Sequence, residues 1–111
     1  MSGRLELWLF ALQRISAMIL APLVLVHLAT MIYAVQGGLT ASEILARTQG
    51  STIWALVYGL FIVSVAVHGA IGLRTVVREM TPWRGTGASA VAALFCVAVL
   101  VLGFRAVGAI T

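Results

Sequence analysis

Charged side chains are scarce in this sequence: they make up 9% of its 111 residues, whereas 62% of the residues are hydrophobic. Soluble domains contain about 25% charged and about 45–50% apolar residues. Residues 15–36, 52–73 and 85–104 are almost free of charge, and each stretch can cross a hydrocarbon core of roughly 30 Å as a helix. Because lipid cannot satisfy backbone polar groups, each span must be helical. The sequence therefore excludes an ordinary soluble domain and predicts an all-α integral membrane protein with three transmembrane helices.

Cysteine is nearly absent as well. The single Cys96 lies within the third apolar stretch, which excludes a disulfide framework and a cysteine-based metal site. We interpret Cys96 as a packing residue.

Lysine does not occur, and all seven basic residues are arginines. They flank the apolar stretches, a pattern that indicates membrane topology rather than binding to nucleic acid. Five of them lie on one side of the predicted membrane and two on the other, namely Arg4, Arg14, Arg74, Arg78 and Arg84 against Arg47 and Arg105. Because arginine is enriched in cytoplasmic loops, we predict a cytoplasmic N-terminus and a C-terminus on the outside.

The predicted transmembrane helices cover about residues 10–35, 52–77 and 86–109. The whole chain, residues 1–111, is predicted to form a single membrane-anchor domain, in which residues 1–14 are a short interfacial segment leading into the first helix. Pro22 removes one backbone hydrogen bond inside the first helix and should bend it. Thr40 and Glu43 have the spacing of a capping box, which predicts a short surface helix between the first two spans.

His68 is an ionisable side chain within a strongly apolar stretch, where such residues are candidates for function. Gly69 and Gly72 remove side-chain bulk beside it, which allows a flat cofactor or another helix to approach. Arg74 and Arg78 follow at headgroup depth. Two interpretations are open. His68 is an axial ligand of heme iron, with the heme propionates at the arginines, or it is hydrogen-bonded to a neighbouring helix, with the arginines snorkelling to the interface.

His27 presents the same choice between a ligand and an interhelical hydrogen bond. Helical rise from Arg14 and from Arg74 places the two histidines at depths that differ by roughly 10 Å. Two axial ligands of one iron lie about 4 Å apart, so the histidines cannot easily serve the same heme. If both are ligands, there are two hemes, and each needs a second ligand from another chain.

Arg14, with Gln13 and Ser16 beside it, opens the first helix at the cytoplasmic interface. Such a cluster can hydrogen-bond the carbonyl groups of a lipid-soluble ligand that arrives from the bilayer. The alternative is a positively charged anchor with two polar residues at a helix end.

Two strings together point to a family. "LQRISAMI" opens the first helix and "HGAIGLR" lies near the end of the second, in a chain with three spans. This combination resembles the cytochrome b membrane-anchor subunit (C chain) of succinate dehydrogenase and fumarate reductase, over roughly residues 9–105. His68, Gly72 and Arg74 match the heme-ligand segment of that family, and Glu79 matches an acidic residue that follows it.

The first helix matches the family in part. Arg14 and Ser16 match the Arg-x-Ser near the family's ubiquinone or menaquinone site. This chain departs from the family at two positions: the family often has histidine where this chain has Gln13, and a quinone-contacting serine where it has Phe10. His27 is similar to an additional ligand in anchors that carry two hemes.

The resemblance implies a membrane-anchor cytochrome b subunit of a succinate:quinone oxidoreductase, a multi-pass protein of the bacterial inner (cytoplasmic) membrane in preference to the mitochondrial inner membrane. It would bind heme b, one or two per complex, contribute to the quinone site, and dock an iron–sulfur subunit and a flavoprotein subunit beside a second small anchor chain. The chain would have no catalytic activity alone. By this resemblance, His68 would be the axial ligand of the proximal heme and His27 that of the distal heme. The heme propionates would be bound by Arg74 and Arg78. The quinone would be bound by Arg14, Ser16 and Gln13.

Two other functions remain open at this point. One is a small proton-coupled transporter or channel subunit that uses His27 and His68 as a proton relay. The other is a heme-free anchor in which both histidines are packing residues.

Overall fold

The computed structural model describes residues 3–83 and 85–111, and all regular structure within them is α-helical. The helices are, in chain order, α1 (Gly3–Gly37), α2 (Ala41–Thr48), α3 (Thr52–Met80) and α4 (Thr86–Ile110). By length and composition, α1, α3 and α4 can each cross a membrane. The all-α class and the three predicted spans are therefore confirmed. The orientation in the membrane stays a prediction, and Arg84, which contributes to it, lies outside the described residues.

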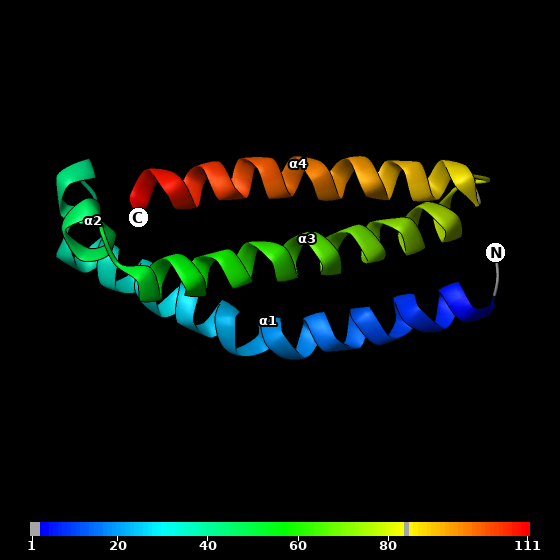
Figure 1. Ribbon diagram of the computed structural model, residues 1–111, viewed down its shortest axis with the longest axis horizontal. Coiled ribbons are helices and arrows are strands. Elements are labelled where there is room, and N and C mark those ends of the chain that lie inside the picture. The colour runs from blue at the N-terminus through cyan, green and yellow to red at the C-terminus, as the bar shows by residue number, and fades with distance from the viewer. Residues whose placement is uncertain (1–2, 84) are drawn as a thin grey trace.

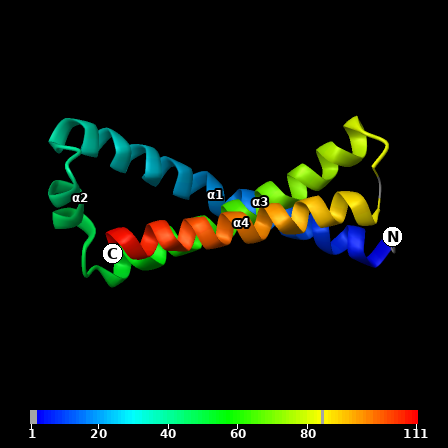
Figure 2. The same cartoon turned by 90° about the horizontal axis from the view of Figure 1, so that it is seen from above.

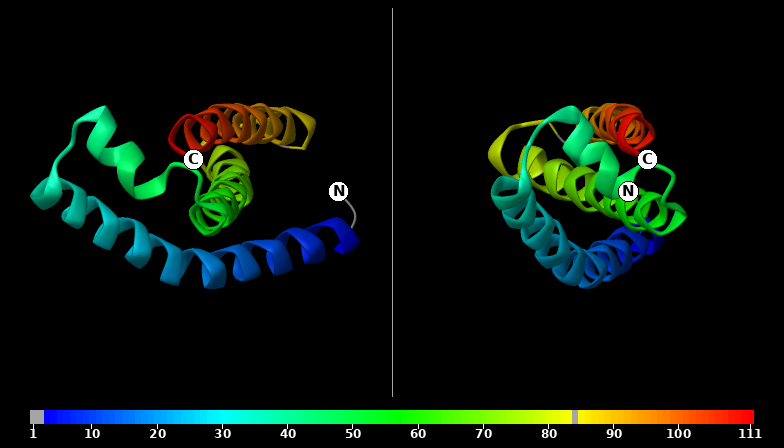
Figure 3. Two further views of the ribbon diagram at one scale, coloured as in Figure 1. Left: turned by 60° about the vertical axis from the view of Figure 1, so that its left-hand side comes forward. Right: turned by 90° about the vertical axis from the view of Figure 1, so that its left-hand side faces the viewer.

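The start of α1 corrects the sequence-based boundary. The helix start near residue 10 is wrong, because α1 is continuous from Gly3. The interfacial position of residues 1–14 stays a prediction. Leucine, glutamate, alanine and arginine dominate its first turns, and these residues favour helix. Pro22 lies inside α1 without ending it, and the helix curves along its length (Figure 3).

The predicted surface helix is confirmed as α2. Thr40 is its N-cap: the Thr40 hydroxyl oxygen accepts from the Glu43 amide at 3.3 Å and donates to the Glu43 carboxylate at 2.5 Å. At the other end of α2, the Thr48 hydroxyl donates to the carbonyl of Ile110 at 2.5 Å. The loop helix is thereby fixed to the last turn of α4.

α3 is the central helix of the bundle, with α1 on one side and α4 on the other (Figure 1). α1 crosses α3 near the middle, and its C-terminal half diverges from α4, with α2 spanning the opening (Figure 2). The longest dimension of 48 Å is close to the thickness of a bilayer with its headgroups, about 40–45 Å. We call the two ends of the bundle the Arg74 end, where α1 and α4 begin and α3 ends, and the α2 end.

Small residues form the core. The buried apolar residues of the described chain are all alanines, whereas many large hydrophobic side chains are exposed. Small residues let helix backbones approach closely, which is how helices pack within lipid. Gly103 of α4 shows how close the approach is, because a Cβ placed there would lie 2.5 Å from a side-chain carbon of Ile62 on α3. The exposed apolar surface is suited to lipid and to other membrane helices. The buried alanines are Ala66, Ala70, Ala88 and Ala92.

Candidate functional site

His68 lies on α3 and faces Ser16 of α1. Its Nδ1 is 3.4 Å from the hydroxyl oxygen of Ser16, and Ser16 is only 5% exposed. The Ser16 hydroxyl also donates to the backbone carbonyl of Gln13 at 3.1 Å. Across residues 3–83 and 85–111, no hydrogen bond engages Nε2 of His68. The imidazole is therefore held by one nitrogen, and its other nitrogen is open to a ligand.

His27 lies on the same face of α1 as Ser16, the face towards α3, but nearer to the α2 end. Its ring packs against Phe61 at 5.0 Å between centroids and edge-on against Tyr58 at 6.4 Å. The Tyr58 hydroxyl is 3.4 Å from that of Thr30, to which it donates. Within the described residues, the buried Nδ1 of His27 has no hydrogen-bond partner. An unpaired buried polar atom is costly, so His27 has the chemistry of a site that another group completes.

A cavity of about 650 Å³ opens beside His27 at the α2 end. All four helices contribute to its walls, which are mostly apolar and aromatic. Arg47 of α2 also lines it, and the Arg47 guanidinium donates to the carbonyl of Gly38 at 2.7 Å and lies over the Tyr33 ring at 5.5 Å. Cavities of roughly 300–1,000 Å³ with a few polar groups are typical of sites for small molecules and cofactors. The representative lining residues are His27, Thr30, Trp54, Tyr58, Phe61 and Val107.

The two histidines lie at different depths of the α1–α3 seam. His68 is beside Ser16, whereas His27 is beside Phe61, which precedes His68 by two helical turns. Two turns correspond to roughly 10 Å along the helix. The geometry agrees with the separation calculated from the sequence, and the two imidazoles are placed at separate levels of the bundle.

Gly69 and Gly72 serve the contacts of α3 with its neighbouring helices. A Cβ at Gly69 would lie 2.9 Å from the ring of Phe95 on α4, and a Cβ at Gly72 would lie 3.5 Å from the amide nitrogen of Gln13 on α1. Of the two explanations for these glycines, the structure supports the approach of another helix.

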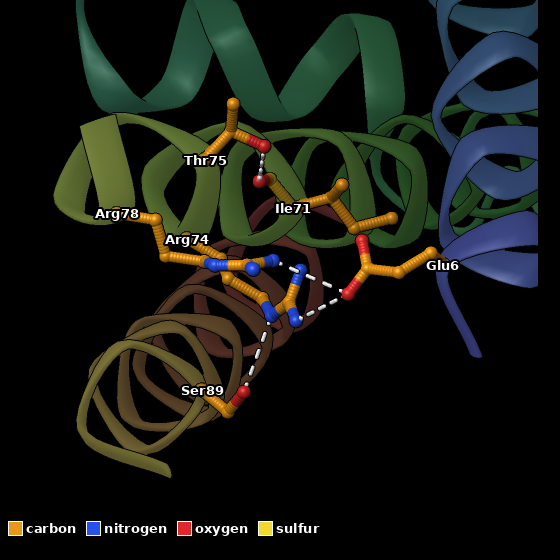
Figure 4. A network of polar contacts seen from close by, with 6 residues as sticks. All are labelled: Glu6, Ile71, Arg74, Thr75, Arg78 and Ser89. Atoms are coloured by element: carbon orange, nitrogen blue, oxygen red, sulfur yellow. Dashed lines mark hydrogen bonds and ion pairs between the residues drawn. The ribbon is translucent and has the colours of Figure 1, made fainter. Parts of the chain in front are cut away.

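Arg74 and Arg78 converge on one carboxylate oxygen at the Arg74 end (Figure 4). Nη2 of Arg74 lies 2.9 Å from Oε1 of Glu6, and Nη1 of Arg78 lies 3.2 Å from the same oxygen. Nε of Arg74 also donates to the hydroxyl of Ser89 on α4 at 3.1 Å. Arg74 is thus buried and bound within the chain. Arg78 is more open, with 30% of its side chain exposed and its Nε without a partner among the described residues.

Arg14 lies apart from the contact between Ser16 and His68. Its side chain is exposed, and its guanidinium lies 5.7 Å from the ring centre of Phe10, one of the two residues at which this chain departs from the resembled family. Gln13 is nearer to the seam, and its buried Oε1 has no hydrogen-bond partner in the described part of the chain. The structure therefore brings Gln13 and Ser16 towards His68 and leaves Arg14 on the outer face of α1.

The sequence-based interpretation missed two residues of these sites, Glu6 and Arg47. Glu6 is one of only three acidic residues, so a search for the partners of Arg74 and Arg78 could have found it. The matching acid named from the sequence, Glu79, is exposed and forms no ion pair within residues 3–83 and 85–111. No sequence signal relates Arg47 to His27, because the folding of α2 over the bundle end brings them to one cavity.

The described residues contain no group of three or more histidine, cysteine or acidic side chains that could hold a metal ion. Each histidine is accordingly a single candidate ligand.

Comparison with known proteins identifies one family. The model of the succinate dehydrogenase/fumarate reductase transmembrane subunit matches residues 1–104. No curated protein and no solved structure matches the chain. The family match confirms the resemblance inferred from the two sequence strings.

Proposed function

This chain belongs to the family of succinate dehydrogenase/fumarate reductase transmembrane subunits, and we propose that it is the cytochrome b anchor of a succinate:quinone oxidoreductase that binds heme b and contributes to the quinone site. Family membership makes it a multi-pass membrane subunit of a complex with other subunits. It also favours this function over the proton relay of a transporter. The observation that carries the heme proposal is His68, whose Nδ1 is held by Ser16 while Nε2 is free to bind iron.

Bound heme would supply a one-electron carrier within the membrane. His68 would hold it by Nε2, and its contact with Ser16 would fix the orientation of the ring. Because the described residues engage only one nitrogen of the imidazole and offer no second ligand beside it, the second ligand would come from a second small anchor chain.

His27 would bind a second heme at the α2 end. The cavity of about 650 Å³ and the unpaired Nδ1 support this assignment. The separation of the two imidazoles by about two helical turns means that one iron cannot bind both. The proposal is therefore two hemes per complex, each shared with the partner chain.

Of the two arginines assigned to the propionates, Arg78 fits that role better. Its side chain is 30% exposed and its buried Nε has no partner among the described residues, which leaves donors for a carboxylate. Arg74 already binds Glu6 and Ser89, so we propose that it acts with Arg78 by holding Glu6 in place and keeping the local charge positive.

The quinone pocket that we propose is formed by Arg14, Gln13 and Ser16. The exposed guanidinium of Arg14 can polarise a quinone carbonyl, and the amide of Gln13 offers a hydrogen-bonding group nearer to His68. The arginine distribution in the sequence supports a cytoplasmic Arg74 end. The iron–sulfur and flavoprotein subunits would dock there, in the cytoplasmic membrane of a bacterium.

A visible absorption spectrum of the purified complex tests the heme proposal. We expect b-type Soret and α bands, and we expect them to weaken when His68→Leu removes one ligand. Ser64→Ala is the control, because Ser64 is buried one helical turn from His68 and has no hydrogen bond with it. A complex without b-type bands, or one whose spectrum is unchanged by His68→Leu, contradicts the proposal.

A further inference from the structure

Ser16 contacts the proposed heme ligand His68 and belongs to the proposed quinone pocket. We propose that Ser16 is a positioning residue for His68: its hydroxyl oxygen accepts the Nδ1–H of the imidazole and fixes the tautomer in which Nε2 carries the free electron pair. This inference rests on the proposed function, since it assigns a role towards the iron that His68 would bind.

The direction of the hydrogen bonds follows from the number of protons. The Ser16 hydroxyl has one proton, and the backbone carbonyl of Gln13, 3.1 Å away, can only accept it. The oxygen of Ser16 then has only acceptor capacity left for Nδ1 of His68 at 3.4 Å. Donation therefore runs from His68 to Ser16 and on to Gln13, and only the Nδ1–H tautomer of neutral histidine satisfies it.

Burial makes this short chain of hydrogen bonds effective. Ser16 is 5% exposed and is the only buried residue within the described part of α1. In a low-dielectric environment, linked hydrogen bonds strengthen one another, and water does not compete for them. At 3.4 Å, the contact is a long hydrogen bond.

The arrangement has a consequence for the iron and another for the quinone pocket. An acceptor on Nδ1–H raises the basicity of a ligating imidazole, which favours the ferric state and lowers the midpoint potential. The Ser16 proton is committed to Gln13, so Ser16 lines the pocket without donating to quinone. The backbone carbonyl of Gln13 and the imidazole of His68 are thereby linked through the hydroxyl group of Ser16.

Redox titration of the purified complex, followed by its b-type absorbance, tests this role with the variants Ser16→Ala and Ser16→Thr. Ser64→Ala is the matched control, because Ser64 is equally buried at 4% exposure and does not hydrogen-bond His68. We expect Ser16→Ala to lower the preference for ferric over ferrous iron by up to about tenfold, a rise in potential of up to about 59 mV. Ser16→Thr and Ser64→Ala should titrate like the parent complex.

Each outcome bears on the inference. A Ser16→Ala complex that loses heme, with Ser16→Thr retaining it, also supports the role of the hydroxyl. An unchanged potential in Ser16→Ala, or an equal change in Ser16→Thr, overturns the inference while the heme function stands. A complex in which His68→Leu leaves the b-type bands intact overturns the proposed function, and this inference with it.

Discussion

Nη2 of Arg74 lies 2.9 Å from Oε1 of Glu6 and thereby joins the first turns of α1 to the last turns of α3. Arg74 also binds Ser89, so a single guanidinium connects three helices at one end of the bundle (Figure 4). The Arg74 side chain is 7% exposed, whereas that of Glu6 is 44% exposed. Because a buried cation without its counter-charge is costly, Glu6 is the residue that makes this position of Arg74 tolerable.

We predict that Glu6→Gln lowers the thermal stability of the purified complex by a few degrees and exposes the first turns of α1. The amide keeps the size of the side chain but removes the charge that faces Arg74 and Arg78. Differential scanning calorimetry and hydrogen exchange over residues 3–10 are the measurements. Glu79→Gln is the matched control, because Glu79 is exposed and has no ion pair in the described residues. Equal effects of the two variants contradict the prediction.

We predict that Gly103→Ala destabilises the α3–α4 contact by about 1–3 kcal/mol. The added methyl group would lie within 3.0 Å of three side-chain carbons of Ile62, so the helices must separate or Ile62 must leave its rotamer. Gly108→Ala lies on the same helix with no atom within 4 Å of the new Cβ. It should be neutral or stabilising, because alanine favours helix over glycine. Unfolding of the two variants in detergent at matched conditions gives the comparison.

The fold was largely predictable from the sequence because lipid leaves few choices. Charge-free stretches of this length must be helical, and the Thr40–Glu43 spacing predicts a capped helix that the structure confirms. The start of α1 was not predictable in the same way. Hydropathy marks where a helix becomes apolar, whereas the helix itself extends to Gly3 through residues that are polar and helix-forming.

The site was predictable only where one residue carries the signal. His27 and His68 stand out because ionisable groups are rare in apolar stretches. The partners of such residues come from other helices. No sequence spacing relates Ser16 of α1 to His68 of α3, and none relates Glu6 of α1 to Arg74 of α3. The same limit applies to Arg47, which reaches the cavity beside His27 because α2 folds back over the bundle.

We predict that Thr48→Val loosens α2 from the rest of the bundle. The Thr48 hydroxyl is buried and donates to the Ile110 carbonyl on α4, which valine cannot do. Loss of a buried hydrogen bond costs about 1 kcal/mol. Hydrogen exchange over α2 should therefore rise. Thr75→Val is the control, since the exposed Thr75 hydroxyl bonds only the carbonyl of Ile71 in its own helix. If exchange over α2 rises no more in Thr48→Val than in the control, α2 is held by other contacts.

We predict that His27→Leu removes one of two hemes and leaves the other. Leucine fills the space of the ring but offers no ligand to a metal, and the level of His68 is about two helical turns away. Heme quantified per complex, together with separate potentials in a redox titration, measures the result. His27→Leu and His68→Leu should each retain a different component. Full heme content in His27→Leu would instead identify His27 as a packing residue.

We predict that Arg14→Gln impairs quinone reduction without affecting heme or stability. The Arg14 side chain is exposed, has no hydrogen bond or ion pair among the described residues, and lies 5.7 Å from the ring centre of Phe10, so the fold loses little when it is replaced. A hydrogen bond from a charged donor contributes about 1.5–3 kcal/mol. We therefore expect kcat/KM for quinone to fall by about one to two orders of magnitude.

Arg105→Gln is the matched control, because Arg105 is equally exposed but lies near the α2 end, on α4. Quinone kinetics, the b-type spectrum and Tm are measured together for both variants. A fall in kcat/KM that accompanies heme loss, or that Arg105→Gln reproduces, would remove Arg14 from the proposed pocket. A selective fall places quinone beside Arg14 on the outer face of α1, the helix whose Ser16 contacts His68.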